Sequence, residues 1–134
     1  MLSRAQATEL GYASQIERLK DTSNGPGCRW RDSETNEVAI VMLNDQPLGL
    51  TGAYQNKDIF GYFEPLNIAG YPAVLGGAID NRDNGACAMS VGVTDKQVIT
   101  LTASMLPGTA AAKRPCAVLK RAGEMAVETM SAGA

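Results

Sequence analysis

The sequence predicts an α+β fold in which a single antiparallel sheet built from hairpins is packed by an N-terminal and a C-terminal helix. Two runs of alternating apolar residues predict the hairpins, and a helical spacing of apolar residues near the C-terminus predicts the second helix. The chain has 134 residues, of which 45% are hydrophobic, and this is enough for one core. We therefore expect one domain over residues 1–134.

The first element is a short helix. Ser3 is followed three residues later by Gln6, which is the spacing of a capping box, and Gly11 is suited to end a helix. This pattern predicts a helix over residues 4–10. In residues 12–24 the apolar residues are sparse, so we expect only a marginal helical turn or a loop.

The next segment predicts the first hairpin. Cys28–Asp32 and Glu37–Leu43 both have strand character, and residues 33–36 are typical of a turn. After this hairpin, Leu48–Phe60 has a weak helical spacing that two glycines interrupt.

Two further strands are predicted in the middle of the chain. Tyr62–Ile68 is expected to be broken or bulged at Pro65, and Ala73–Ile79 is expected to follow it. Asp80–Gly85 predicts a polar turn. A calcium loop is disfavoured there, because Arg82 stands where a ligand is needed and no glutamate follows at the right distance.

The second hairpin has the clearest alternation. Cys87–Thr94 and Gln97–Ser104 flank a tight turn at residues 95–96. Alternation places two sets of apolar residues on the core face: Cys87, Met89, Val91 and Val93 on the first strand, and Ile99, Leu101 and Ala103 on the second.

A long amphipathic helix is expected at the end of the chain. Leu106–Lys113 predicts a loop, and Pro115 suits the first position of the helix. The helix should bury one set of residues against the sheet and expose another. The buried set is Val118, Leu119, Ala122, Met125 and Ala126, and the exposed set is Lys120, Arg121, Glu124 and Glu128.

The composition argues against most catalytic chemistry. The chain has no histidine, which excludes Ser-His and Cys-His nucleophiles and histidine-bound zinc. Its three cysteines, Cys28, Cys87 and Cys116, form no CxxC pair. We therefore predict no enzyme, no catalytic residue, no cofactor and no metal. Carboxylates could still catalyse a reaction, but none of the 14 acidic residues stands in an apolar run that would raise its pKa.

The charge and hydropathy of the chain argue against a nucleic-acid partner and against a membrane-spanning segment. The formal net charge is −2 and no basic stripe is present, so we do not expect a nucleic-acid partner. No apolar run approaches the roughly 20 residues of a membrane-spanning helix, so no membrane span is expected.

Three aromatic residues are candidates for binding: Trp30, Tyr62 and Tyr71. Trp30 could form a platform with its neighbours Arg29 and Arg31, but strand alternation favours an inward tryptophan between two outward arginines. Tyr62 and Tyr71 could line a groove, although packing in the core or in turns is favoured.

Several motifs recur together in a known family. They are Leu2-Ser3 with Glu9-Leu10-Gly11, Cys28-Arg29-Trp30, Ile68 to Ala73, Cys87 shortly before Val91-Gly92-Val93, and Arg114-Pro115-Cys116. In this order and over nearly the whole chain, they resemble an actinobacterial family of secreted lipoproteins, the domain of unknown function 3558.

The resemblance implies a location and a cysteine pairing. Members carry a signal peptide, a lipidated cysteine and a linker before the domain, so the protein is expected to be extracytoplasmic, either lipid-anchored or secreted. They also have a fourth cysteine just before the first helix. The resemblance then implies that Cys28 pairs with Cys87, and that Cys116 lies unpaired beside the first helix, near Met1 or Leu2.

The function expected from these observations is non-catalytic binding. The ligand would be an envelope protein, a peptide or a wall-derived molecule, held in a groove between the sheet and the helices. Two alternatives stay open: an accessory subunit of an envelope secretion system, with a large exposed apolar patch, and a small carboxylate-dependent, glycan-active enzyme with two converging acids.

Overall fold

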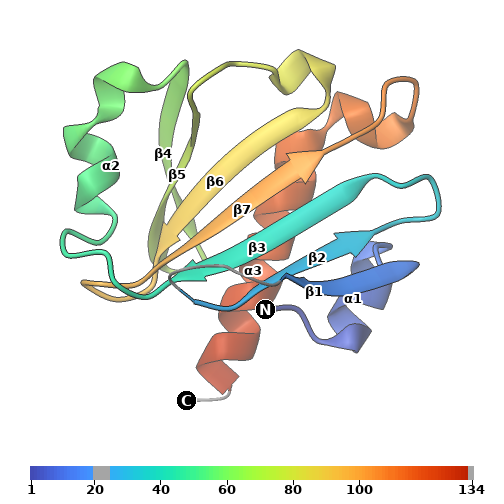
Figure 1. Cartoon of the computed structure of the whole chain (residues 1–134), viewed down its shortest axis with the longest axis horizontal. Helices are drawn as coiled ribbons and strands as arrows, with labels where there is room; N and C mark the ends of the chain where they lie inside the picture. Colours follow the sequence, from blue (N-terminus) through green and yellow to red (C-terminus); the bar gives the residue numbers. More distant parts are fainter. Residues whose placement is uncertain (20–24, 133–134) are drawn as a thin grey trace.

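The computed structural model describes residues 1–19 and 25–132, and within them one antiparallel sheet has the strand order β1-β2-β3-β7-β6-β5-β4 (Figure 1). The strands are β1 (Gln15–Leu19), β2 (Gly27–Arg31), β3 (Glu37–Leu43), β4 (Tyr62–Ile68), β5 (Tyr71–Gly77), β6 (Ala86–Gly92) and β7 (Val98–Ser104). The helices are α1 (Arg4–Leu10), α2 (Thr51–Gln55) and α3 (Pro115–Ala132). Short 3-10 turns are η1 (Lys57–Ile59), η2 (Arg82–Asn84) and η3 (Ala110–Lys113). The predicted α+β class is confirmed.

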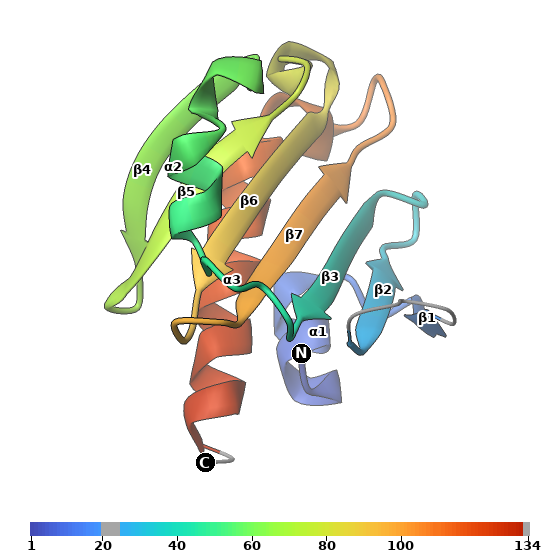
Figure 2. The same ribbon diagram turned by 60° about the vertical axis from the view of Figure 1, so that its left-hand side comes forward.

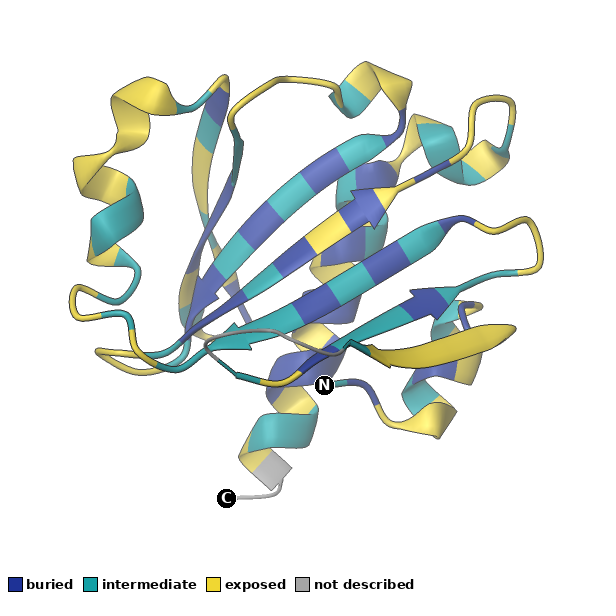
Figure 3. Cartoon of the chain, viewed as in Figure 1, coloured by how far each residue is buried: buried dark blue, intermediate teal, exposed yellow. Residues whose placement is uncertain are grey.

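The helices divide unequally between the two faces of the sheet. Helix α3 crosses one face, where it packs on β6, β7 and β4, and α1 lies beside it (Figures 1 and 2). Helix α2 lies on the opposite face, where it borders a hollow together with residues of β6 and β7 (Figure 2). The strands alternate between buried and half-exposed residues, most clearly in β3, β6 and β7 (Figure 3). The core therefore lies between the sheet and α3.

The core contains the residues that alternation predicted. The fully buried side chains include Trp30, Val38, Ile40, Met89, Val91, Ile99, Leu101, Leu119 and Met125. Ala122 and Ala126 are also buried, and the four predicted charged residues of α3 are exposed. Val118 is only half-buried, because it lies toward the side of α3 rather than on its sheet-facing centre.

Helix α1 forms as its sequence predicts. Ser3 and Gln6 make the reciprocal hydrogen bonds of a capping box, and Gly11 ends the helix in the left-handed conformation with φ of 91°. The Gln6 side-chain amide also donates to the Met125 carbonyl at 2.9 Å, and its oxygen accepts from Thr129 at 2.6 Å. The same glutamine thus caps α1 and attaches it to the C-terminal half of α3.

The predicted secondary structure was wrong for two segments, residues 15–19 and residues 48–60. Residues 15–19 form strand β1 rather than a helical turn or loop, because they pair with β2. Residues 20–24 lie outside the described part of the chain. The expected helix over Leu48–Phe60 is reduced to the five-residue α2 and the η1 turn, consistent with the low helix propensity of its glycines.

Strand β4 is continuous, contrary to the expected break at Pro65. Its seven residues pair with β5 in one register, and Pro65 lies opposite Val74. Because β4 is the edge of the sheet, a proline can be accommodated there without losing a ladder hydrogen bond.

A buried asparagine fixes the turn of the first hairpin. Asn36 is fully buried, and its amide nitrogen donates to Asp32 at 2.9 Å. Its amide oxygen accepts from the Leu106 backbone N–H at 2.7 Å and from the Thr109 hydroxyl at 3.3 Å. The β2–β3 turn is therefore joined to the loop that leads from β7 to η3.

The predicted disulfide between Cys28 and Cys87 is wrong. The structure instead joins Cys87 to Cys116, with their Cα atoms 5.3 Å apart. Cys28 lies on β2 and Cys87 on β6, and strands β3 and β7 separate them. Three strand spacings amount to about 14 Å, whereas a disulfide needs Cα atoms within about 7 Å.

The position predicted for Cys116 is also wrong. The start of α1 lies beside the C-terminal half of α3, as the hydrogen bond from Gln6 to Met125 shows, whereas Cys116 lies in the first turn of α3 and is bonded to Cys87. Nine helical residues separate the two places by about 14 Å. The free cysteine is instead Cys28, on β2.

A buried tyrosine makes the stability depend on pH in the alkaline range. Burial, aided by the charges of Asp32 and Glu34, raises the pKa of Tyr12 to about 12. The Tyr12 hydroxyl donates to the Met105 sulfur at 3.4 Å. The folded state therefore favours the neutral phenol, and this contribution is complete below the unfolded pKa of about 10 and lost as pH rises toward 12.

We therefore predict that the free energy of unfolding falls between about pH 10 and 12, and that this fall is smaller in Tyr12→Phe. Urea unfolding of both proteins at closely spaced pH values measures the difference. Identical pH profiles for the two proteins would contradict the assignment to Tyr12.

Candidate binding groove

The structure makes only one of the three candidate aromatic residues available for binding. Trp30 is 1% exposed and lies in the core, so it forms no platform, although the prediction that it points inward is confirmed. Its neighbours Arg29 and Arg31 lie on the opposite face, where they pair with Glu17 at 2.9 Å and Glu37 at 3.0 Å.

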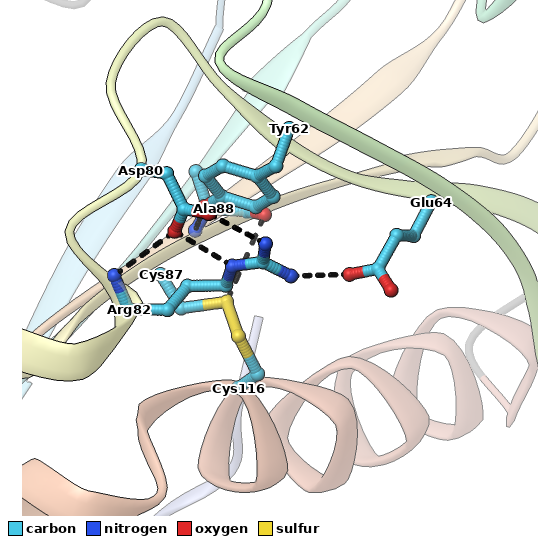
Figure 4. Close-up of a disulfide and its surroundings, with 7 residues drawn as sticks. All are labelled: Tyr62, Glu64, Asp80, Arg82, Cys87, Ala88 and Cys116. Carbon is cyan, nitrogen blue, oxygen red and sulfur yellow. Dashed lines mark hydrogen bonds and ion pairs between the residues drawn. A yellow bond between two sulfur atoms is a disulfide. The ribbon is translucent and has the colours of Figure 1, made fainter.

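Tyr62 is closed off by a polar cluster next to the disulfide (Figure 4). The guanidinium of Arg82 lies over the Tyr62 ring, 4.1 Å from its centre, and pairs with Asp80 and Glu64. The Tyr62 hydroxyl accepts a hydrogen bond from the Ala88 backbone N–H at 2.9 Å. Tyr62 therefore packs beneath Arg82 of the β5–β6 connection and is buried.

The electrostatics of this cluster do not favour proton transfer by Asp80. Its hydrogen bonds with Arg82 lower the pKa of Asp80 to about 2, so the carboxyl is ionised near neutral pH. The same pairing raises the pKa of Arg82 above its usual value. The pair is thus a fixed, mutually neutralising contact, and Asp80 has no proton to donate.

Tyr71 is half-exposed and lines two neighbouring hollows at one end of the sheet. The first hollow, of about 140 Å³, is bounded by β5, the β6–β7 turn and the last turns of α3, and the second, of about 560 Å³, is bounded by β5, the end of β6 and the β3–α2 connection. Tyr71, Val93 and Thr94 line both of them. We call the two hollows together the Tyr71 groove. It lies at the end of the sheet where β5 and β7 begin (Figure 1).

The lining of the Tyr71 groove is mostly apolar. Its apolar residues, besides Tyr71 and Val93, are Pro47, Leu48, Leu50, Pro72, Val127 and Met130. Tyr71, Val93 and Met130 also pack against the core, which holds that side of the groove in place. Leu48 is 53% exposed, so one wall offers apolar surface to solvent.

Two glycines allow the walls of the groove to come together. Gly49 has φ of 54°, and a Cβ atom there would lie 2.5 Å from the Asp95 carbonyl oxygen. The Gln46 backbone N–H donates to the Lys96 carbonyl at 3.0 Å, which joins the same two loops. At Gly92, a Cβ atom would lie 3.0 Å from Leu50 Cβ, so the absence of a side chain lets Leu50 approach the strand.

The polar groups of the groove lie at its rim. Thr94 and Gln97 hydrogen-bond to each other at 3.3 Å across the β6–β7 turn, and the Gln97 amide donates to Asn44 at 2.9 Å. Asp95 is exposed on the same turn. The groove therefore offers a mostly apolar surface with a few polar groups, which is the general form of a ligand pocket.

Sequence reasoning identified Tyr71 but missed the rest of the groove. Its other residues come from the β3–α2 connection, the β6–β7 turn and the end of α3, which are far apart along the chain. The one available signal was Gly92 at the end of an apolar strand, because a glycine there indicates a close approach of another segment.

No group of three or more cysteine, aspartate or glutamate side chains in the described part of the chain could hold a metal ion. Among the helices of residues 1–19 and 25–132, none combines the length and the apolar character that crossing a bilayer requires.

Comparison with solved structures gives one similar protein from Bacteroides thetaiotaomicron VPI-5482, whose crystal structure has a resolution of 1.50 Å. The two chains are 12% identical and superpose with a TM-score of 0.49. The match covers 84% of this chain and 40% of the other, so this chain spans less than half the length of that protein.

No curated protein matches the sequence. One family model does, and it is described as a protein of unknown function, DUF3558. The match covers residues 1–129, which is nearly the whole chain and includes every strand and most of α3. On this evidence, the chain belongs to the DUF3558 family.

Proposed function

We propose that this protein is a non-catalytic binding module whose Tyr71 groove takes an apolar segment of a peptide or protein in the cell envelope. The observation that carries the proposal is a pair of mostly apolar hollows that share Tyr71, a half-exposed aromatic residue, in their lining. An apolar site with a few polar groups at its rim fits the general form of ligand pockets.

The lining supports a peptide in preference to a wall-derived sugar. The walls are built from leucine, proline, valine and methionine side chains, and the only aromatic residue is Tyr71. Such walls bind aliphatic side chains by burying apolar surface, at about 25 cal/mol per Å². The hydroxyl groups of a sugar would find few partners on them.

An extracytoplasmic location is part of the proposal. The Cys87–Cys116 disulfide supports it, because structural disulfides persist mainly in oxidising compartments. Attachment to the cell membrane through a lipid anchor, or secretion, is proposed in keeping with the lipoprotein resemblance.

Binding to an array of random decapeptides tests this function. We expect the protein to select peptides with two or more apolar residues. Leu48→Ser removes exposed apolar surface from the groove, so we expect its binding to the selected peptides to be about fivefold weaker, equivalent to about 1 kcal/mol. Isothermal titration calorimetry with the strongest peptides measures the change.

Leu106→Ser is the matched control. Leu106 is 45% exposed, similar to Leu48, but it lines neither hollow of the groove. Its substitution should leave peptide affinity unchanged. Equal loss in both variants, or no peptide selection by the native protein, would contradict binding at the Tyr71 groove.

The two alternative functions have less support. For a glycan-active enzyme, a carboxyl with a raised pKa would be needed as the acid, and the pKa of Asp80 is instead lowered by Arg82. For an accessory subunit of a secretion system, a broad apolar patch would be needed. Ile59 and Ile79 are each 72% exposed, but they are single residues on a 3-10 turn and a loop.

A further inference from the structure

The Tyr71 groove has one charged residue among those that line it, and that residue is acidic. Asp95 lies at the tip of the β6–β7 turn and borders the larger hollow, whose other lining residues are uncharged. Lys96, the next residue in the turn, lines neither hollow. Among the described residues, the lining of the groove thus carries a single negative charge and no positive charge.

The Asp95 carboxylate is available to a partner. In residues 1–19 and 25–132, the arginine side chains that form ion pairs do so with other acids, and Asp95 takes part in none of these pairs. Asp95 differs in this respect from Asp80, whose charge is already neutralised by Arg82.

The backbone of Asp95 is also held in a fixed place. The close approach of Gly49 to the Asp95 carbonyl and the hydrogen bond from Gln46 to Lys96 connect this turn to the loop that carries Leu48 and Leu50. The backbone of Asp95 is therefore held beside the larger hollow, and its exposed side chain extends from this fixed position. A ligand that fills this hollow brings its neighbouring residues to this charge.

We propose that the segment bound in the Tyr71 groove carries a lysine or arginine next to its apolar residues, and that Asp95 pairs with this cation. The proposal rests on the proposed function, since it identifies which apolar peptides the groove prefers. Charge complementarity of this kind at the rim of a site contributes more to selectivity and association rate than to affinity.

The test compares the native protein with Asp95→Asn on the random decapeptide array. We expect the native protein to select peptides in which a basic residue lies within about three positions of an apolar pair. Asp95→Asn should keep the apolar preference and lose the basic one. For a selected basic peptide, its affinity should fall roughly two- to fivefold, as expected for one exposed ion pair.

Asp58→Asn is the matched control, because Asp58 is exposed, lies on η1 and lines neither hollow of the groove. It removes the same charge and should leave selection unchanged. A second measurement varies ionic strength. Added salt should weaken the binding of a basic peptide to the native protein, and it should have little effect on the same peptide with glutamine in place of the basic residue.

The outcomes separate the two proposals. Apolar selection without a basic preference, or a basic preference that persists in Asp95→Asn, overturns the role of Asp95 and leaves the proposed function standing. Absence of any peptide selection overturns both. Loss of the basic preference in Asp58→Asn as well as in Asp95→Asn would show an effect of net charge and would also overturn the assignment.

Discussion

Removing the Cys87–Cys116 disulfide is expected to lower the free energy of unfolding by about 3–4 kcal/mol. The bond closes a loop with a sequence separation of 29, and the chain-entropy model gives a cost of this size when such a loop opens. It also attaches the first turn of α3 to the core face of β6 (Figure 4). Urea unfolding of the double variant Cys87→Ala, Cys116→Ala measures the loss.

Cys28→Ala provides the control for this prediction. Cys28 is a free, half-buried thiol, so its substitution should change stability by much less than loss of the disulfide does. Mass spectrometry of the non-reduced, alkylated protein should find a Cys87–Cys116 linked peptide and an alkylated Cys28. A linked peptide that contains Cys28 would contradict the pairing.

Leu119→Ala is expected to lower the free energy of unfolding by about 2–5 kcal/mol. Leu119 is fully buried, on the side of α3 that packs on β6 and β7. Truncation removes apolar contacts and leaves a cavity that the well-packed core fills only in part. Chemical denaturation of the variant gives the value, and a loss below about 0.5 kcal/mol would show that α3 is peripheral to the core.

Val118→Ala is the comparison for Leu119→Ala. Val118 is the neighbouring residue and is only half-buried. It loses fewer methylene groups from a less buried position, so the destabilisation should be clearly smaller. Similar losses of stability for the two variants would mean that Val118 is as deeply buried as Leu119, which would contradict the structure.

The hairpins and the outer helices could be predicted from the sequence because their signals are local. The capping box of Ser3 and Gln6 defines α1, and the bounds of β3 and β4 agree with the predicted Glu37–Leu43 and Tyr62–Ile68. In each case the hydrogen bonds or the side-chain alternation involve residues close together in the chain, and tertiary contacts agree with them.

The features that the sequence did not predict depend on distant contacts. Strand β1 has no apolar alternation and exists because β2 offers an edge for pairing. The cysteine pairing depends on the strand order, which places β3 and β7 between Cys28 and Cys87. The sequence did place Cys87 on the core face and Cys116 in the first turn of α3, but their contact followed only once α3 was known to cross β6.

In the candidate site, too, the sequence indicated a single residue, whereas its surroundings depend on contacts between distant parts of the chain. Trp30, Tyr62 and Tyr71 were all candidates for binding, although alternation favoured an inward Trp30, and the structure leaves only Tyr71 half-exposed. Arg82, which covers Tyr62, belongs to a turn that lies 20 residues further along the chain. Availability for binding is a property of the folded surface, and it required the structure.

Nuclear magnetic resonance mapping of the site tests the central proposal most directly. The native protein, labelled with ¹⁵N, would be titrated with the decapeptide that it binds most strongly on the array. We predict that the largest amide shifts fall on residues of the Tyr71 groove, including Tyr71, Val93, Thr94 and Asp95, and that Leu48→Ser reduces them at equal peptide concentration. Shifts concentrated on other parts of the surface, or no shifts with any decapeptide, would contradict binding at this groove.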